Sequence, residues 1–186
     1  MKLTFQKDDL LNGINIVLKA VPSKTTMPIL ECILIDASDN QIKLTANDME
    51  LGIETKVEGS ILSRGKIALD AKLLSEIIRK LSGGESDITI ESDEKYNTTI
   101  TCDNSVFHIQ GKNGDEFSYL PFIEKDHFIC LSQFTLKEVI RQTLFSISVN
   151  DSNKMMTGEL FQVTDNELKV VSLDGHRMSI RKIELK

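Results

Sequence analysis

The stretch Asp165-Asn-Glu-Leu-Lys-Val-Val-Ser-Leu-Asp-Gly-His-Arg-Met178 decides the fold, because its opening occurs three times in the chain. The same Asp-Asn-x-aliphatic pattern begins at Asp39 and at Asp103, so the copies lie 64 and 62 residues apart. Each copy is followed by a strand-like run and then by a turn that carries an aspartate: Asp48, Asp115 and Asp174. A regular internal similarity of this kind indicates a repeated supersecondary unit.

A helical pattern recurs with the same period. In the first repeat, aliphatic residues at helical spacing form one stripe: Leu10, Leu11, Ile14, Val17 and Leu18. Adding 63 to positions 10, 11, 14 and 18 gives a second aliphatic stripe: Leu73, Leu74, Ile77 and Leu81. Adding 63 again to positions 73, 77 and 81 gives a third: Leu136, Ile140 and Leu144. We therefore expect three equivalent helices.

The ends of the second and third helices carry recognisable signals. Asp70 can cap the second helix by accepting from its first free amides, and Ser82-Gly-Gly84 can end it. Thr135-Leu-Lys-Glu138 has the pattern of a capping box for the third helix.

A short strand is expected before each helix, and three strands after it. The strands before the helices are Lys2–Gln6, Lys66–Leu69 and Phe128–Leu131. Those after them are Ile29–Ala37, Gln41–Ala46 and Met49–Glu58; Asp87–Ser92, Thr98–Asp103 and Val106–Gly111; and Thr157–Thr164, Glu167–Leu173 and Arg177–Glu184. Alternating apolar and polar residues favour antiparallel pairing. The repeat is thus β-α-β-β-β, and the fold class is α+β, with helices on one face of antiparallel sheets.

Two repeats packed helix to helix would bury both helical stripes, so a complete domain should hold a pair. Residues 1–126 form such a domain, with 114–126 as a connector, and residues 127–186 form half of a second domain. The third repeat has no partner repeat in the sequence. Either it pairs with another chain, or the chain is a piece of something longer.

Composition places the chain among soluble proteins, with 40% hydrophobic and 27% charged residues and a net charge of −6. The three cysteines lie far apart in apolar runs, which predicts reduced core thiols and a reducing, cytoplasmic location. The N-terminus has no apolar segment typical of a signal peptide, and no apolar run is long enough to span a membrane. The acidic balance alone argues against nucleic-acid binding, although the distribution of charge decides the local field.

Three stretches resemble the bacterial sliding clamp family, the beta subunits of DNA polymerase III: Met1-Lys-Leu-Thr-Phe5, Met27-Pro-Ile-Leu30 and Leu173-Asp-Gly-His-Arg-Met178. The resemblance implies a DNA-clamp fold with six repeats in three domains, of which this chain matches the first domain and the first half of the second. It implies a non-catalytic processivity factor that encircles double-stranded DNA without reading its sequence. Two full-length chains would close head to tail into a homodimeric ring.

The resemblance also implies a DNA-facing surface on the helices. Lys72, Arg79 and Lys80 in the second helix outweigh Glu76, and Lys137 and Arg141 in the third outweigh Glu138, so the helices sum to +3 in an acidic chain. Lys24 and Lys154 match further DNA-contacting positions in loops. The alternative is that these charged residues form an ordinary solvent-exposed helix surface of mixed charge that binds no DNA.

Two protein-binding surfaces are implied as well. Polymerase, clamp loader and repair proteins would dock linear peptides in a cleft whose residues here are Met156, Leu173, Gly175, His176, Arg177 and Met178. Methionine and leucine make an adaptable apolar surface, although they could equally belong to a core. The strand carrying Val106, Phe107 and Ile109 would meet the other chain of the dimer, because an unpaired strand edge invites pairing.

The sequence carries no pattern for catalysis, a metal site or a cofactor. Gly83-Gly84 lacks the Lys-Ser/Thr of a phosphate-binding loop, and the three histidines show no ligand spacing with cysteine. We therefore expect no enzymatic activity, and a hydrolase that uses Asp174 and His176 is the least favoured hypothesis. The main alternative to the clamp is a peptide-binding interaction module that binds no DNA.

Overall fold

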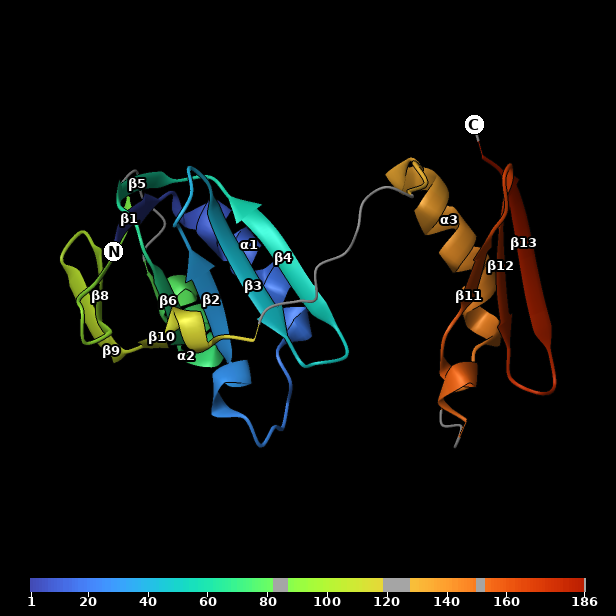
Figure 1. Ribbon diagram of the computed structural model, residues 1–186, viewed down its shortest axis with the longest axis horizontal. Helices are drawn as coiled ribbons and strands as arrows, with labels where there is room; N and C mark the ends of the chain where they lie inside the picture. Colours follow the sequence, from blue (N-terminus) through green and yellow to red (C-terminus); the bar gives the residue numbers. More distant parts are fainter. Residues whose placement is uncertain (82–86, 119–127, 150–152, 186) are drawn as a thin grey trace. The chain divides into compact units, whose positions relative to one another are not determined.

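The computed structural model describes residues 1–186 except 82–86, 119–127, 150–152 and 186 (Figure 1). Contacts divide the chain into two compact units, Met1–Phe122 and Ile123–Lys186, called here the N-terminal and C-terminal modules. Both combine helices with antiparallel sheets, which confirms the predicted α+β class. No helix among the described residues is long and apolar enough to cross a membrane.

The N-terminal module contains two β-α-β-β-β repeats. The first comprises β1 (Lys2–Phe5), α1 (Lys7–Val17), β2 (Cys32–Asp36), β3 (Ile42–Asn47) and β4 (Gly52–Val57). The second comprises β6 (Lys66–Asp70), α2 (Ala71–Lys80), β7 (Ile88–Ser92), β8 (Asn97–Cys102) and β9 (Ser105–Gln110). Two short strands were not foreseen: β5 (Ser60–Ser63) and β10 (Lys112–Asn113). Single 3-10 turns lie at Leu18–Ala20, Pro28–Glu31 and Gly114–Glu116.

The two repeats exchange their first strands. One sheet has the order β5-β1-β7-β8-β9, so β1, the first strand of repeat one, lies beside β7 of repeat two. The other sheet has the order β10-β6-β2-β3-β4, so β6, the first strand of repeat two, lies beside β2 of repeat one. Leu3 is the register partner of Ile90, and Ala68 is the partner of Leu34. Each repeat therefore completes the sheet of the other.

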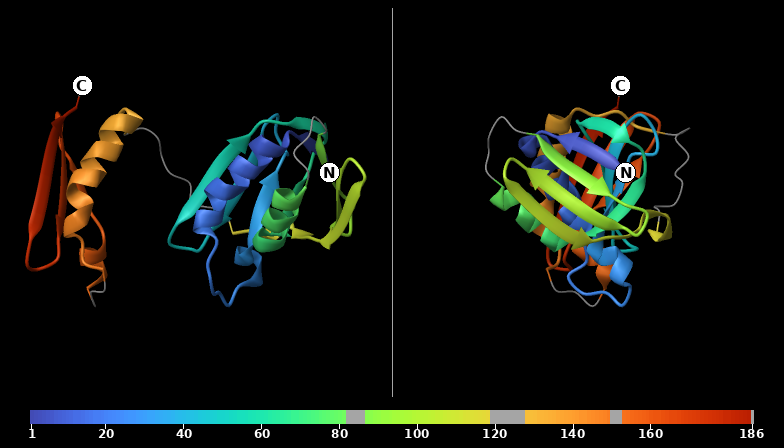
Figure 2. Two further views of the ribbon diagram at one scale, coloured as in Figure 1. Left: turned by 180° about the vertical axis from the view of Figure 1, so that it is seen from behind. Right: turned by 90° about the vertical axis from the view of Figure 1, so that its left-hand side faces the viewer.

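The helices lie side by side in the core of this module (Figure 2). Their inward residues Leu10, Ile14, Leu74 and Ile78 are fully buried, in one cluster with residues of both sheets. Their first-turn caps, Gln6 and Asp70, lie 64 residues apart, and the Asp70 carboxylate accepts from Leu73 N at 2.8 Å as predicted.

The cap positions correct the predicted period of 63. A spacing of 64 pairs Leu10 with Leu74 and Ile14 with Ile78, so Leu73 falls on the outer face, where it is 44% exposed. Its place in the apolar stripe was therefore predicted wrongly, by one residue along the helix. The predicted stop at Ser82-Gly-Gly84 lies outside the described residues.

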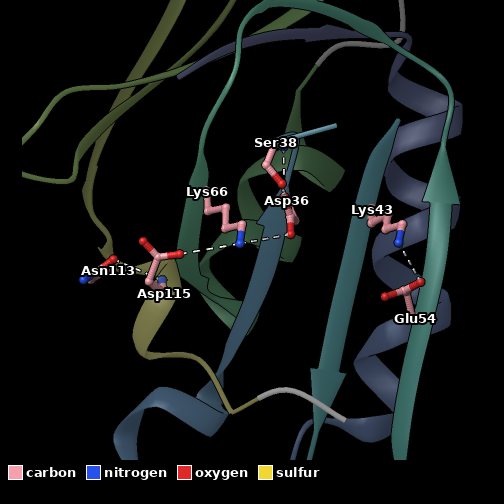
Figure 3. A network of polar contacts seen from close by, with 7 residues as sticks. All are labelled: Asp36, Ser38, Lys43, Glu54, Lys66, Asn113 and Asp115. Atoms are coloured by element: carbon pink, nitrogen blue, oxygen red, sulfur yellow. Dashed lines mark hydrogen bonds and ion pairs between the residues drawn. The ribbon is translucent and has the colours of Figure 1, made fainter. Parts of the chain in front are cut away.

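A polar network fastens the end of the N-terminal module to its sheet (Figure 3). The Lys66 ammonium lies 3.7 Å from Asp36 and 3.5 Å from Asp115, so it joins β6, β2 and the turn after β10. Asn113 caps that turn by accepting from Asp115 N at 3.0 Å. Phe117 then packs, fully buried, on the outer side of the sheet, so the first part of the expected connector is ordered structure.

The C-terminal module holds α3 (Gln133–Thr143), two 3-10 turns (Leu144–Ser146 and Lys154–Thr157) and the sheet β11-β12-β13. Its strands are Leu160–Val163, Glu167–Leu173 and Met178–Glu184. The buried apolar residues are few: Val139, Leu168 and Val170. Polar contacts supplement these apolar residues. Ser172 Oγ donates to Thr143 O at 2.5 Å, and the hydroxyl oxygens of Ser146 and Ser179 lie 2.6 Å apart.

Three further expectations fail in this module. Residues 128–131 are not a strand, because a first strand pairs with a neighbouring repeat and the described residues offer none. The cap of α3 is Ser132, which accepts from Thr135 N at 3.0 Å, so Thr135 does not begin a capping box. Cys130 is exposed, unlike the buried Cys32 and Cys102, although all three are free thiols.

The Asp-Asn echo is also less regular than its spacing suggests. Asp39 and Asp165 lie in the first hairpin after a helix, between β2 and β3 and between β11 and β12. Asp103 lies instead in the second hairpin of its repeat, between β8 and β9. The segment between the helix and the strand that follows it is shorter in repeat two than in repeat one. The 64-residue spacing from Asp39 to Asp103 therefore relates two positions that are not structurally equivalent.

Candidate functional site

The outer face of α2 carries its basic residues. Lys72, Arg79 and Lys80 are all exposed and share this face with Glu76, while the opposite face is buried. The Arg79 guanidinium donates to Asn15 Oδ1 on α1 at 2.9 Å, which holds it along the helix pair. Three of the predicted DNA-contacting residues therefore lie on one solvent-facing surface.

Lys7 was not foreseen as part of this region. Its ammonium donates to the carbonyl oxygens of Leu81 and of Arg79, the latter at 3.4 Å. A cation at the C-terminal end of a helix satisfies free carbonyls and opposes the negative end of the helix dipole. Lys7 thus stabilises the end of α2 that bears Arg79 and Lys80.

The loop that carries Lys24 lies near the start of α2. Lys24 is exposed, and the preceding residues Val21, Pro22 and Ser23 line a small hollow together with Lys72. Glu31 and Asp70 line the same hollow, so its charge is mixed. The loop therefore extends the basic surface of α2 only at its rim.

In the C-terminal module, α3 exposes Lys137 and Arg141. Arg141 makes a two-pronged ion pair with Glu138, at 3.0 Å from Nε and 2.8 Å from Nη2. This hydrogen-bonded pair lowers the pKa of the Glu138 carboxyl. The carboxylate consequently offsets much of the charge of Arg141, so Lys137 contributes more to the field of this helix. Lys154 is exposed on the 3-10 turn Lys154–Thr157.

The turn between β12 and β13 brings five predicted cleft residues together. Leu173, Gly175, His176, Arg177 and Met178 line one open hollow of about 260 Å³. Leu173 and Met178 are register partners, and Met178 is 60% exposed. Met156, the sixth predicted residue, is half-buried on the 3-10 turn and is not among the residues that line this hollow.

Asp174 fixes the shape of this turn. Its carboxylate accepts from the backbone amides of His176 and Arg177, both at 3.0 Å, and from Arg177 Nε at 2.8 Å. These bonds, the one from His176 N–H first, hold the pKa of Asp174 below its ordinary value. Gly175 has φ +84°, which favours glycine. The Arg177 guanidinium also lies 5.9 Å from the centre of the Phe145 ring, a contact that no sequence pattern indicated.

Further apolar residues continue the cleft surface across the sheet. Residues 168, 170 and 172 of β12 are buried toward α3, so Val171 and Leu173 face the other way. Leu160 and Ile180 are the register partners of Val171 and are exposed. The alternation of β12 could have revealed this strip, had it been followed beyond the Asp-Gly-His-Arg turn.

The predicted interface strand is an open edge. β9 pairs with β8 and ends its five-stranded sheet. Val106 points to solvent, whereas Phe107 and Ile109 are half-buried against the core. The structure therefore presents backbone hydrogen-bonding groups and one apolar side chain at this edge.

Among the described residues, no group of three or more His, Cys, Asp or Glu is placed to hold a metal ion.

The turn between β3 and β4 repeats the hydrogen bonding of the cleft turn. Asp48 accepts from Glu50 N at 2.9 Å and from Leu51 N at 2.7 Å, as Asp174 does from His176 and Arg177. Met49 occupies the place of Gly175 with φ +76°. Asp115, the aspartate predicted for the corresponding turn of repeat two, lies instead in the 3-10 turn after β10.

Comparison with known proteins places these features in one family. The family model for the N-terminal domain of the DNA polymerase III beta subunit matches residues 1–121, and that for the central domain matches residues 130–186. The beta sliding clamps of Bacillus subtilis and Staphylococcus epidermidis are 38% and 35% identical over the whole chain. The chain spans about half the length of these curated relatives.

Solved structures agree. A protein assigned as the DNA polymerase III beta subunit of Eubacterium rectale is 64% identical with a TM-score of 0.93, covering 100% of this chain and 50% of that one. The sliding clamp of Bacillus subtilis is 36% identical, also with a TM-score of 0.93 and the same coverage. These matches confirm the predicted clamp fold. The chain belongs to the DNA polymerase III beta subunit family.

Proposed function

We propose that this chain supplies part of a sliding clamp, a non-catalytic processivity factor that surrounds duplex DNA and tethers a polymerase. Residues 1–126 would be its first domain and residues 127–186 the first half of its second. The two family models match in this order along the chain, which supports the assignment. The relatives named beta sliding clamp favour this function over a peptide-binding module that binds no DNA.

The helices would face the DNA. Lys72, Arg79 and Lys80 form an exposed basic surface on α2, in a chain whose net charge is −6. Attraction to phosphates is independent of sequence, and an acidic remainder limits its strength, as sliding requires. Lys137 and Arg141 on α3, with Lys24 and Lys154 in their loops, would add weaker contacts. The ordered α2 surface is the observation that carries this proposal.

The turn from Leu173 to Met178 would receive linear peptides of polymerase, clamp loader and repair proteins. The apolar Leu173 and Met178 line the same hollow as the exposed His176 and Arg177. Apolar pockets with a few placed polar groups are typical of ligand-binding sites in general. Met156 would then contribute from outside the hollow.

The open edge of β9 would join a second full-length chain in a head-to-tail homodimeric ring. Val106 would be buried on assembly, while Phe107 and Ile109 would set the strand against its own core. Sheet continuation across an exposed edge satisfies the free backbone groups. Such a protein would act in the cytoplasm, where DNA is replicated.

Binding of the whole chain to a short DNA duplex at low salt tests the proposed DNA surface. Reversing two charges on α2 (Arg79→Glu with Lys80→Glu) should weaken binding about tenfold. The slope of the logarithm of the binding constant against the logarithm of the salt concentration should become shallower by about two. The matched control, Lys56→Glu with Lys95→Glu, reverses two exposed lysines on β4 and on the β7–β8 turn. Equal losses in both variants would contradict a helix-borne surface.

A parallel titration with a polymerase-derived peptide separates the two candidate functions. Peptide binding that persists while the chain shows no affinity for DNA would favour the interaction module instead.

A further inference from the structure

The end of the N-terminal module lies on its sheet as a separate layer. Residues 112–118, called here the strap, comprise β10, the 3-10 turn after it and the residues up to Ser118. The strap pairs with β6, packs on the side of the sheet away from the helices, and reaches β3, where Asn47 Nδ2 donates to Ser118 O at 2.6 Å (Figure 3). Its start is anchored, because the Gly111 amide donates to Tyr96 O at 2.8 Å.

The strap is organised by hydrogen bonds of its own. Asn113 Oδ1 accepts from Asp115 N at 3.0 Å, and Asn113 Nδ2 donates to Glu116 Oε1 at 3.4 Å. Phe117 N donates to Gly114 O at 3.2 Å, which closes the 3-10 turn. None of these bonds involves the sheet, so they can persist when the strap leaves it. The strap can therefore move as one unit.

The polar contacts that hold the strap lie at the surface. Lys112 Nζ donates to Pro28 O at 2.6 Å, and Asp115, whose side chain is 75% exposed, lies 3.5 Å from Lys66 Nζ. Exposed ion pairs of this kind contribute little to stability, because water solvates both partners. β10 is only two residues long, and β6 keeps β2 as its partner on the other side. The sheet therefore does not depend on the strap.

Phe117 is the one apolar side chain of the strap, and it is 2% exposed. It packs in a small cluster with Cys32, Leu34 and Ala68. This cluster is separate from the main core, which holds the neighbouring Ile33 on the helix side of the sheet. Segments with few buried apolar contacts open at a lower free energy than the core does. Release of Phe117 would thus leave the main core intact.

We propose that the strap is a conformational device that leaves the sheet as a unit while the N-terminal module stays folded. Release adds residues 112–118 to the stretch that joins the two modules. Seven extended residues span up to about 24 Å, so the modules gain reach when the strap is released and lose it when the strap is docked. The proposal goes beyond the clamp function, concerns the N-terminal module alone and does not depend on DNA binding.

Gly114 shows how closely the strap is seated. A Cβ at this position would lie 2.7 Å from Lys66 Cβ and 2.9 Å from the Lys66 carbonyl carbon. Because Lys66 belongs to β6, which is paired with β2, the strap must yield rather than the strand. Gly114→Ala therefore displaces the strap without deleting any atom from it. Gly158→Ala is the matched control, since no atom lies within 4 Å of the Cβ position at Gly158.

The three cysteines report on opening at different depths. Cys130 is exposed, Cys102 is buried in the main core, and Cys32 is buried in the cluster that holds Phe117. Burial raises the pKa of the Cys32 thiol, and the neighbouring Lys112 of the strap opposes that rise. A buried thiol reacts only when its surroundings open. Modification of Cys32 therefore measures release of the strap, and modification of Cys102 measures opening of the main core.

The rate at which iodoacetamide modifies each cysteine of the whole chain, followed by mass spectrometry under native conditions, tests the proposal. Cys130 should react first, Cys32 second and Cys102 last. Equal rates at Cys32 and Cys102 would show that the strap opens only when the whole module unfolds, and would overturn the proposal.

The variants test the cause of the opening. Gly114→Ala should raise the rate at Cys32 about tenfold and Phe117→Ala about a hundredfold, because each weakens the docked state. The rate at Cys102 should not change in Gly114→Ala, and Gly158→Ala should change neither rate. An unchanged rate at Cys32 in Gly114→Ala, or an equal rise at Cys102, contradicts independent release.

Small-angle X-ray scattering tests the consequence for the link between the modules. The radius of gyration of the whole chain should be larger for Phe117→Ala than for the wild type, whereas Gly158→Ala should leave it unchanged. An unchanged radius of gyration in Phe117→Ala, despite faster modification of Cys32, would show that release does not lengthen the link and would overturn that part of the proposal.

Discussion

The two modules are built from the same repeat, yet they bury their helices very differently. In the N-terminal module, Ile14 and Ile78 are both fully buried because a neighbouring helix and an exchanged strand cover them. In the C-terminal module the equivalent Ile140 is half-buried, and polar groups such as Thr143 and Ser172 make up part of the core. A helical stripe in this fold therefore becomes a core only when a second repeat completes it.

The largest expected effect comes from truncating equivalent isoleucines. Ile78→Ala should lower the free energy of unfolding of the N-terminal module by about 2–5 kcal/mol, because it leaves a cavity in a closed core. Ile140→Ala should lower that of the C-terminal module by about 1 kcal/mol, since less apolar surface is buried there. Chemical denaturation followed by hydrogen exchange separates the modules. Equal losses would contradict the contrast.

The two equivalent turns offer a second comparison. Gly175→Ala should destabilise the C-terminal module by about 1–2 kcal/mol, because an L side chain resists the left-handed backbone. Met49→Gly relieves the same strain in the N-terminal module, but glycine costs about 0.5–1 kcal/mol in backbone entropy. A small net gain in melting temperature is therefore expected. A large loss in Met49→Gly would show that the Met49 side chain makes an essential contact.

The helix caps offer a third comparison between the modules. Ser132→Ala should cost the C-terminal module about 1 kcal/mol, and Asp70→Ala should cost the N-terminal module a similar amount, because each removes the acceptor of a free helix amide. Thr135→Ala provides the control, since Thr135 lies inside α3. Thermal melts of the three variants check the assignment. A larger loss of stability for Thr135→Ala than for Ser132→Ala would instead support Thr135 as the helix cap.

The repeat could be predicted from sequence because its signals are local. Helical periodicity placed all three helices, and the cap at Asp70 was visible as a single residue. The strand exchange was not visible, because pairing between β1 and β7 depends on residues almost ninety positions apart. The failure of residues 128–131 to form a strand follows from the same cause: a strand needs a partner, and its own residues cannot supply one.

For the candidate site, sequence placed the parts that belong to one turn or one helix face. Leu173 to Met178 lie together because they form one hairpin turn, and Lys72 and Arg79 share a face because they are seven residues apart. Contacts between distant segments were missed, such as Lys7 with the end of α2 and Arg177 with Phe145. These depend on packing that no local pattern encodes.

The exchanged first strand also constrains how the chain folds as it is made. Lys2 pairs with Glu91 and Phe5 with Ile88, so β1 reaches its neighbour β7 only after most of the second repeat has been synthesised. Contacts between such distant segments slow folding, because a long loop must close before the contact forms. During synthesis, β1 can therefore pair first with β5 and must wait for the second repeat before its other edge is filled. Neither repeat can complete its sheet alone, so the pair should fold as one cooperative unit.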